Sequence, residues 1–230
     1  MKILVSWSSG KDSAWMLHTL RSQHPGAVAG LLTTLNEAFD RVAMHAVRRE
    51  LLQAQADAAG YPLHAVNLPW PCSNADYQQR MGEAVAGFVG NGFTHVAFGD
   101  LFLEDVRRYR EETLAGTGLT PLFPLWKTQS TAELAREMIA GGLRAHLTCV
   151  DPRKLEPSFA GRSFDAQLLA DLPASVDPCG ENGEFHSFVH DGPMFTQPIP
   201  VRIGEVVSRD GFVFADLVAD QAGLPSPPTC

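Results

Sequence analysis

Short apolar runs alternate along the chain with longer stretches in which apolar residues recur every three or four positions. The short runs have the length of buried strands, and the longer spacing is that of amphipathic helices. The first run covers residues 2–7, and the stretch after it carries Met16, Leu17 and Leu20 on one helical face. This alternation predicts an α/β fold with a mostly parallel sheet.

The later elements follow from the same pattern. We expect further strands at residues 28–35, 63–68, 95–98 and 145–150. One helical stripe starts at Met44 and ends at Gly60, where a left-handed cap suits glycine. Ser130 and Glu133 form a predicted capping box at the start of another helix.

The character of the sequence changes after Asp151: helical patterns become scarcer, while proline and glycine become more frequent. Residues 212–218 are predicted to form the return strand of a hairpin that turns at Asp210 and Gly211. We therefore predict a larger α/β domain over residues 1–150 and a smaller α+β domain over residues 151–222. Residues 223–230 are expected to form a mobile tail.

Composition and charge narrow the class of protein. The chain has 230 residues, of which 45% are hydrophobic and 19% charged, so it can bury a substantial core. Its formal net charge of -8 disfavours a protein whose main task is to bind nucleic acid. No apolar run approaches the roughly 20 residues of a membrane-spanning helix, and the first residues do not resemble a signal peptide. We expect no membrane partner and a cytoplasmic location. The 4 cysteines contain no Cys-x-x-Cys pair, which argues against a zinc site or a disulfide framework.

Residues 8–13, Ser-Ser-Gly-Lys-Asp-Ser, lie between the first predicted strand and the first helix, and we call them the phosphate loop. Small residues let a ligand approach the backbone, and the free amides at a helix start attract anions. The segment is not a Walker loop, because Val5 and Asp12 stand where that motif needs glycine and Ser or Thr. The phosphate-binding candidates are Ser8, Ser9, Gly10, Lys11, Asp12 and Ser13. The alternative is an ordinary polar turn with a helix cap.

Two carboxylates near this loop are candidates for a magnesium site. Lys11 would add a positive charge to the phosphate loop, while Asp12 could hold Mg²⁺ or its water. Asp100 follows Gly99 at the end of the strand expected at residues 95–98, so both residues should face the same cleft. The alternative for Asp100 is a helix cap.

Residues 177–186, Asp-Pro-Cys-Gly-Glu-Asn-Gly-Glu-Phe-His, concentrate turn-forming and ionisable groups, and we call them the second motif. Glu181, Glu184 and His186 could position an amine or ammonia, or act as acid and base. Asn182 lies between them. The alternative is a solvated turn with exposed carboxylates. Cys179 shows no sign of thiolate activation, which favours a packing role.

Both motifs resemble those of known families. The phosphate loop resembles the Ser-Gly-Gly-Lys-Asp-Ser loop of the ATP pyrophosphatases, which split ATP between its α and β phosphates, although Ser9 stands where glycine is usual. The second motif, followed by Ser187, resembles the Asp-Pro-Cys-Gly-Glu-Asn-Gly-Glu-Phe-His-Thr motif of the diphthine–ammonia ligase family. Residues 119–126 resemble that family's Gly-Leu-x-Pro-Leu-x-Pro-Leu-Trp segment. The resemblance implies a Rossmann-like nucleotide domain of the adenine nucleotide α-hydrolase type, which faces a smaller domain.

The resemblance also implies an activity, ATP-dependent amidation with Mg²⁺. A carboxylate would attack the α phosphate, pyrophosphate would leave, and ammonia would displace AMP from the acyl-adenylate. Lys11 would act on the departing pyrophosphate. Glu181, Glu184 or His186 would position ammonia or take its proton, and together with Asn182 they would contact the second substrate.

Three more residues are candidates for contact with ATP. Arg107 and Arg110 lie three apart on one face of a predicted helix, which suits phosphates or a substrate carboxylate. The neighbouring glutamates make a surface ion-pair face an equal alternative. His45 lies near the start of the second helix, where related enzymes hold adenine, and its alternative is a partly buried helix histidine.

The acceptor and the oligomeric state are open. Diphthine belongs to elongation factor 2 of eukaryotes and archaea, whereas 14 arginines against 4 lysines suggest a GC-rich, bacterial genome. An ATP pyrophosphatase that acts on a different acceptor is therefore an alternative. A regulator that binds ATP or AMP without turnover is another, and a homodimer is compatible with either.

Overall fold

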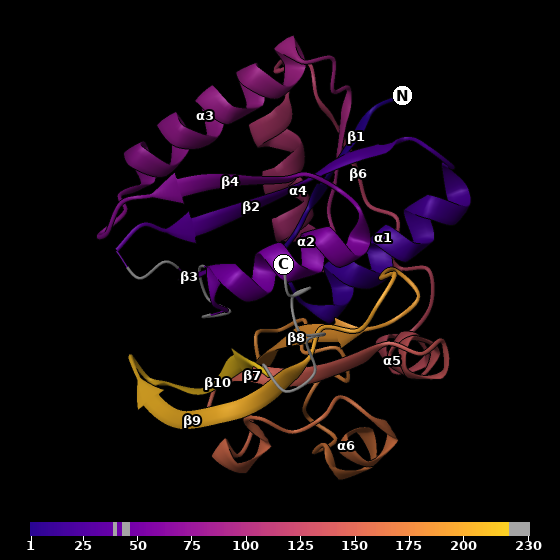
Figure 1. The fold of residues 1–230 in the computed structure, drawn as a ribbon, viewed down its shortest axis with the longest axis vertical. Helices are drawn as coiled ribbons and strands as arrows, with labels where there is room; N and C mark the ends of the chain where they lie inside the picture. The colour runs from indigo at the N-terminus through magenta and orange to yellow at the C-terminus, as the bar shows by residue number, and fades with distance from the viewer. Residues whose placement is uncertain (39–40, 43–46, 221–230) are drawn as a thin grey trace, which may run out of the picture.

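The computed structural model describes residues 1–38, 41–42 and 47–220, which form two β-sheets with helices between and around them (Figure 1). The first sheet has the strand order β4-β2-β1-β5-β6, all parallel, and β3 pairs antiparallel with the end of β2. Its strands are β1 (Ile3–Ser6), β2 (Val28–Asn36), β3 (Arg41–Val42), β4 (Leu63–Leu68), β5 (His95–Ala97) and β6 (Thr120–Leu122). The predicted α/β fold with a mostly parallel sheet is confirmed.

Alternating side chains of the strands bury the two faces of this sheet in different cores. Ile3, Val5 and Leu31 pack in one core with α1 and α2, whereas Leu4 and Leu32 pack in another with α3 and α4. This is the two-residue period of a strand covered on both faces. The helices are α1 (Lys11–Gln23), α2 (Arg49–Ala59), α3 (Asn74–Gly90), α4 (Glu104–Leu114) and α5 (Thr131–Ala140).

The second sheet is antiparallel, with the order β8-β7-β10-β9. It consists of β7 (Arg144–Val150), β8 (Phe185–Asp191), β9 (Val201–Arg209) and β10 (Phe212–Ala219), with the short helices η1 (Pro157–Phe159) and α6 (Ala166–Asp171) before β8. The predicted hairpin is present: Asp210 and Gly211 have φ values of 52° and 82°, the left-handed pair that a tight two-residue hairpin turn needs.

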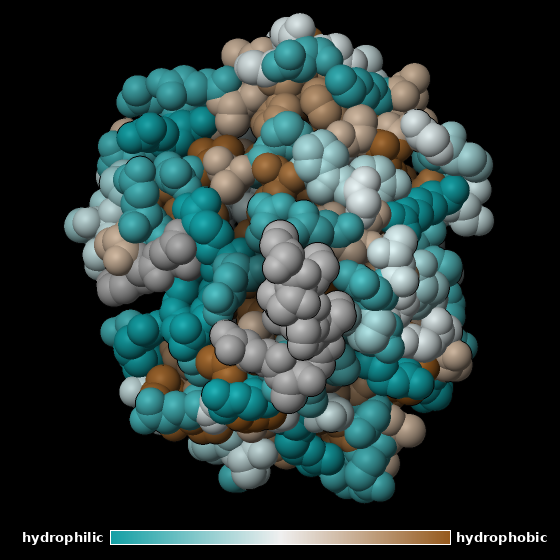
Figure 2. Space-filling model, viewed as in Figure 1, coloured by the Kyte–Doolittle hydropathy of each residue, from teal (hydrophilic) through white to brown (hydrophobic). Residues whose placement is uncertain are grey.

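The layers meet at α1 and α2, which lie between the two sheets (Figure 1). One continuous core joins them, since Trp15 and Met16 of α1 share it with Leu147 of β7 and Phe188 of β8. None of the helices in the described ranges is long and apolar enough to cross a membrane. On the face in Figure 2, hydrophobic residues show only in small groups among hydrophilic ones.

Two expectations differ from the structure in their boundaries. Helix α2 begins at Arg49 rather than at Met44, because Arg48 forms a β-bridge with Arg41 and has an extended backbone. Met44 itself lies outside the described residues. Strand β7 pairs with β8 and β10, so it belongs to the second sheet although it falls within residues 1–150. The boundary near residue 150 stays a prediction, and a division by sheets falls before Arg144. Residues 221–230 lie outside the described part, so the expected tail at residues 223–230 is untested.

Candidate active site

The phosphate loop lies where β1 feeds α1, at the carboxyl edge of the parallel sheet. Helix α1 begins at Lys11, with Gly10 as its extended N-cap residue. The first amides of a helix have no partner within the helix, and its dipole is positive at this end. Gly99, after β5, packs against this first turn: a Cβ atom there would lie 3.1 Å from the Asp12 carbonyl carbon. Glycine at position 99 therefore allows β5 to approach α1, and its contact with ATP stays a prediction.

Ser9 has a backbone conformation that is unfavourable for a residue with a Cβ atom. Its φ is 71°, in the left-handed region, and its side chain is fully buried. The Ser9 carbonyl accepts hydrogen bonds of 3.0 Å from both the Val189 amide and Gln55 Nε2, so β8 and α2 hold this backbone in place. The Ser9 hydroxyl is buried without a hydrogen-bond partner in the described structure. Glycine would reach this φ without strain.

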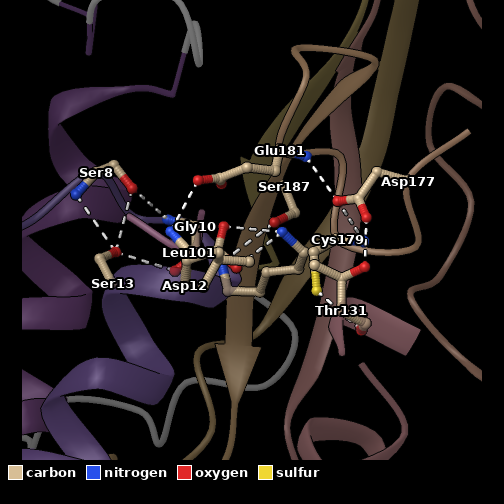
Figure 3. Close-up of polar contacts among 11 residues, drawn as sticks. Ser8, Gly10, Asp12, Ser13, Leu101, Thr131, Asp177, Cys179, Glu181 and Ser187 are labelled. Carbon is tan, nitrogen blue, oxygen red and sulfur yellow. Dashed lines mark hydrogen bonds and ion pairs between the residues drawn. The ribbon is translucent and has the colours of Figure 1, made fainter. Parts of the chain in front are cut away.

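The two other serines of the loop contact each other. The Ser8 and Ser13 hydroxyl oxygens are 3.1 Å apart, and the Ser13 hydroxyl donates to the Gly10 carbonyl at 3.0 Å (Figure 3). These bonds shape the turn. Ser8 also lines the main cavity of the molecule.

Lys11 is buried and forms an ion pair with its neighbour Asp12, at 2.8 Å between Nζ and Oδ2. Burial alone would lower the pKa of the Lys11 ammonium, but the carboxylates of Asp12 and Glu181 outweigh it and raise that pKa. The ammonium group therefore stays charged. It also lies 5.5 Å from the centre of the Phe185 ring, so Lys11 is directed toward the second motif as well as Asp12.

The second motif and Ser187, which follows it, lie against the phosphate loop and Leu101. The Leu101 amide donates to Glu181 Oε1 at 2.8 Å, and the Lys11 amide donates to the Ser187 hydroxyl at 3.2 Å. Figure 3 shows the Glu181 carboxylate extending from its own loop toward Leu101 and the phosphate loop. Asp177 fixes that loop by accepting the amides of Cys179 and Glu181 at 3.2 and 2.9 Å. The alternative of a merely solvated turn does not describe this segment.

Glu181 is suited to proton transfer. Burial raises the pKa of Glu181 to about 7, although the hydrogen bond from the Leu101 amide favours the charged form and lowers that pKa. The nearby negative charge of Asp12 adds to the increase, and Lys11 opposes it. A carboxylate with a pKa near neutrality can accept a proton and release it again under physiological conditions.

The other polar residues of the second motif have different surroundings. Glu184 is buried, and its Oε1 accepts from the Asp177 amide at 3.0 Å and from Asn182 Nδ2 at 3.2 Å. Glu184 and Asn182 therefore stabilise the loop. His186 lines the same cavity as Ser8, and burial and the charge of Lys11 lower its pKa to about 4, which leaves it neutral. Burial raises the pKa of the Cys179 thiol, which donates to the Thr131 carbonyl. That thiol is packed and protonated.

The two arginines of α4 that were candidates for contact with ATP lie in different surroundings. Arg107 pairs with Glu111 at 2.8 Å and stacks on the Phe123 and Trp126 rings, as the surface ion-pair alternative expects. Arg110 lines the cavity beside Ser8 and His186 instead. His45 lies outside the described residues.

Asp12 and Asp100 as magnesium ligands stay a prediction. Asp100 is not a helix cap, because α4 starts after Leu103. Its Oδ2 is buried without a hydrogen bond, 3.7 Å from Arg110 Nε, and burial raises its pKa, with a further contribution from the charge of Asp12. Within the described ranges no three metal-ligating side chains gather in one place. Mg²⁺ commonly needs only one or two carboxylates in addition to phosphate oxygens.

Comparison with known proteins assigns the family. Residues 130–214 match the family model of the diphthamide synthase C-terminal domain. A diphthine–ammonia ligase of Danio rerio is 30% identical over 237 aligned positions, which cover 94% of this chain and 92% of that protein. The Mus musculus ligase is 33% identical, with 94% and 88% covered. The chain belongs to the diphthine–ammonia ligase family. Its fold and its membership of a family of ligase enzymes are therefore as expected.

The similarity to some ligases of this family is partial. The alignment with the Homo sapiens ligase, at 34% identity, covers 49% of this chain and 44% of that protein. The Schizosaccharomyces pombe ligase is 24% identical, and the alignment covers 37% of its length. Both are substantially longer than the part that this chain matches.

The sequence does not predict a cavity of about 810 Å³ that opens beside the phosphate loop. It runs from Ser8, His186 and the end of β2 into the space between α3 and α4. Thr33 and Thr34 could have been found, since they lie near the carboxyl end of a parallel strand. The lining residues of α3 carry no local signal, because their pattern is that of any amphipathic helix.

Gln55 was also missed. It is fully buried, accepts from Trp7 Nε1 at 2.9 Å, and donates to the carbonyls of Ser9 and Val189 at 3.0 and 2.6 Å. A buried glutamine on a helical stripe is the only signal that the sequence holds. Its role follows from the three elements that it joins.

Proposed function

We propose that this chain is an ATP-dependent amide ligase that couples a carboxylate to ammonia and releases AMP and pyrophosphate. The observation that carries the proposal is the approach of the two motifs: the Lys11 ammonium lies 5.5 Å from the centre of the Phe185 ring and within the electrostatic influence of the Glu181 carboxylate. A phosphate-binding turn and a neutral-range base thus belong to one site. The names of the relatives support ligation with ammonia.

In the first step, ATP would lie with its phosphates on the amides of residues 10–13. The acceptor carboxylate attacks the α phosphorus, the bond to the β phosphate breaks, and pyrophosphate leaves with the electron pair. Lys11 and the positive end of α1 stabilise the charge on the departing pyrophosphate. Asp12 and Asp100 would hold Mg²⁺, which neutralises phosphate charge when bound. Because Lys11 pairs with Asp12 in the structure, binding of Mg²⁺-ATP would divide that pair between metal and phosphate.

In the second step, ammonia attacks the acyl carbon and AMP leaves. The attacking nitrogen loses a proton to Glu181, whose pKa of about 7 suits a base. Neutral His186 lines the cavity nearby and would orient the nucleophile or the acyl group through a hydrogen bond. Glu184 and Asn182 would act by holding the loop that carries Glu181.

The domain division fits this scheme. The parallel sheet and its helices would bind the nucleotide, and the antiparallel sheet would present the second motif to it. Diphthine is the acceptor that the relatives' names give. A different carboxylate acceptor is the second candidate, favoured by the arginine-rich, lysine-poor composition.

Product analysis tests the proposal. The purified chain is incubated with ATP, Mg²⁺, ammonium and a panel of carboxylic acids, and the nucleotides are identified by ³¹P NMR. AMP with pyrophosphate is the expected result. Release of ADP with phosphate would refute attack at the α phosphate, and tight ATP binding without turnover across the panel would favour the regulator.

A further inference from the structure

An ion-pair cluster connects the second sheet to β3, which lies between the end of β2 and that sheet (Figure 1). Asp216 of β10 pairs with Arg41 of β3, at 2.8 Å between Oδ1 and the guanidinium. Its two carboxylate oxygens also accept hydrogen bonds from Nε and Nη2 of Arg48, the N-cap residue of α2. One carboxylate of the second sheet thus binds two arginines that flank the parallel sheet, and we call these three residues the arginine clamp.

The backbone of the β9–β10 hairpin presents Asp216 to the two arginines. The register of this strand pair shifts between Ala215 and Leu217, on either side of Asp216. Such a β-bulge changes the direction of the side chains beside it. Gly204 of β9 allows the close approach, because a Cβ atom there would lie 3.3 Å from the Asp216 carbonyl oxygen. The bulge therefore helps to direct Asp216 toward Arg41 and Arg48.

The contacts of Asp216 are closer to a fixed joint than to a loose surface pair. Only 21% of its side chain is exposed. Burial alone would raise the pKa of Asp216, but the hydrogen bonds and charges of Arg48 and Arg41 lower it, so the carboxylate is ionised. A guanidinium that binds both oxygens of a carboxylate also fixes the angle between the two groups. Without this carboxylate, the two neighbouring arginines would repel each other.

The clamp holds one wall of the cavity. Arg41 and Arg48 form an antiparallel β-bridge, and the Val42 amide donates to the Val47 carbonyl beside it. Each side of this short ladder thus carries one arginine of the clamp. Val42 lines the cavity and pairs with Leu35 at the end of β2. The position of the Val42 side chain therefore depends on the contact of Asp216 with both arginines.

This wall adjoins the place proposed for the phosphates of ATP. Ser8 of the phosphate loop and Thr34 of β2 line the cavity together with Val42. Ligands of open α/β sheets bind outside the carboxyl ends of the strands, and β1 and β2 end here. A nucleotide with its phosphates on residues 10–13 would place its nucleoside in the adjoining space, where Val42 offers an apolar surface.

We propose that Asp216 is a positioning residue for ATP, which holds Val42 against the nucleoside through Arg41 and Arg48. Asp216 itself does not contact the nucleotide. The second sheet, which carries the second motif into the site, would then also set the shape of the nucleotide pocket. This inference rests on the proposed function for the place of ATP.

Calorimetric titration of the whole chain with Mg²⁺ and α,β-methylene-ATP tests the proposal. Asp216→Asn keeps the size of the side chain and removes its charge, and it should raise the Kd at least about threefold, an effect that substitutions away from a ligand can produce. Asp171→Asn is the matched control, because it breaks a carboxylate–arginine pair with Arg162 that does not adjoin the cavity. Its Kd should stay within about twofold of the parent.

A merely structural role of Asp216 would give a different result. Partial unfolding lowers the number of binding sites per chain and leaves the Kd of the folded molecules unchanged. A rise in Kd of less than about threefold in Asp216→Asn, or an equal rise in Asp171→Asn, would overturn the proposal.

Arg48→Gln tests whether the clamp acts as one unit. This variant should also raise the Kd, and the double variant with Asp216→Asn should stay within about twofold of Asp216→Asn alone, because both changes remove the same contact. Effects that multiply in the double variant would show two independent roles and overturn the proposal. If Asp216→Asn does not fold, Arg48→Gln decides the matter, and an unchanged Kd in that variant would overturn the proposal.

The two proposals fail separately, because the titration requires no turnover. A chain that forms AMP and pyrophosphate but whose Kd does not respond to Asp216→Asn loses the role of the clamp and keeps the ligase function. A chain that releases ADP from ATP but whose Kd rises in Asp216→Asn loses the ligase function and keeps the clamp.

Discussion

Replacement of Ser9 by glycine should stabilise this protein. Ser9 has a φ of 71° and a buried hydroxyl without a hydrogen bond, and both features are unfavourable. A left-handed backbone costs a residue with a Cβ atom about 1–2 kcal/mol, and an unsatisfied buried hydroxyl costs about 1 kcal/mol or more. Glycine loses about 0.5–1 kcal/mol of this gain through the greater entropy of the unfolded chain. The net gain in the free energy of unfolding should be about 1–2 kcal/mol.

Urea unfolding, followed by circular dichroism, measures this difference directly. A gain of that size should raise the melting temperature by roughly 3–6 °C in a chain of this length. Ser9→Ala is the matched control, because it removes the hydroxyl and keeps the unfavourable φ. Its gain should be smaller than that of Ser9→Gly.

Two results would refute the reasoning about Ser9. If Ser9→Gly were no more stable than the parent, the left-handed backbone would carry no strain. If Ser9→Ala matched Ser9→Gly, the hydroxyl alone would account for the gain and the φ argument would be wrong.

Three further substitutions test other contacts of the site. Glu181→Gln should remove the inflection near pH 7 from the amidation rate when rates are compared at equal concentrations of free ammonia. Since the folded pKa of about 7 lies above the ordinary 4.5, Glu181 lowers the free energy of unfolding as pH rises from about 4.5 to about 7, and urea unfolding of the variant should lose this pH dependence. Gln55→Leu leaves Trp7 Nε1 unpaired and removes one of the two hydrogen bonds to the Ser9 carbonyl, so it should lower the free energy of unfolding by about 1–3 kcal/mol. A loss under about 0.5 kcal/mol would contradict the role assigned to Gln55. Lys11→Gln should reduce pyrophosphate release at least about 100-fold while the chain stays folded by circular dichroism; Lys127→Gln, on the surface, is its control, and equal activity of the two variants would remove Lys11 from the reaction.

Local patterns predicted the parts of the fold that depend on local physics. The strands β1, β2, β4 and β5, the end of α2 at Gly60 and the hairpin at Asp210 each follow from hydrophobic period or from a residue that suits a left-handed turn, whereas the short strand β6 was not predicted. The start of α2 was misplaced because Arg48 forms a β-bridge with Arg41 of β3 and so stays outside the helix. Strand β3 in turn pairs with the end of β2, and the helical pattern does not contain that pairing.

The sequence predicted the two motifs of the candidate site, but it did not predict that they lie next to each other. Residues 8–13 and 177–186 are far apart in the sequence, and they meet because β7, β8 and β10 pair into a second sheet that packs on α1. Nothing in either motif specifies the bond from Leu101 to Glu181. The left-handed φ of Ser9 likewise has no signal of its own in the sequence, because it depends on how β8 and α2 hold the Ser9 carbonyl.

The central claim is that the first turn of α1 binds the phosphates of ATP with the α phosphate facing Glu181. A crystal structure with Mg²⁺ and α,β-methylene-ATP, which cannot be cleaved between these phosphates, tests it most directly. We predict the β and γ phosphates on the amides of residues 10–13 and the α phosphate on the side of Leu101 and Glu181. Nucleotide bound elsewhere, with the Lys11–Asp12 pair undisturbed, would contradict the account.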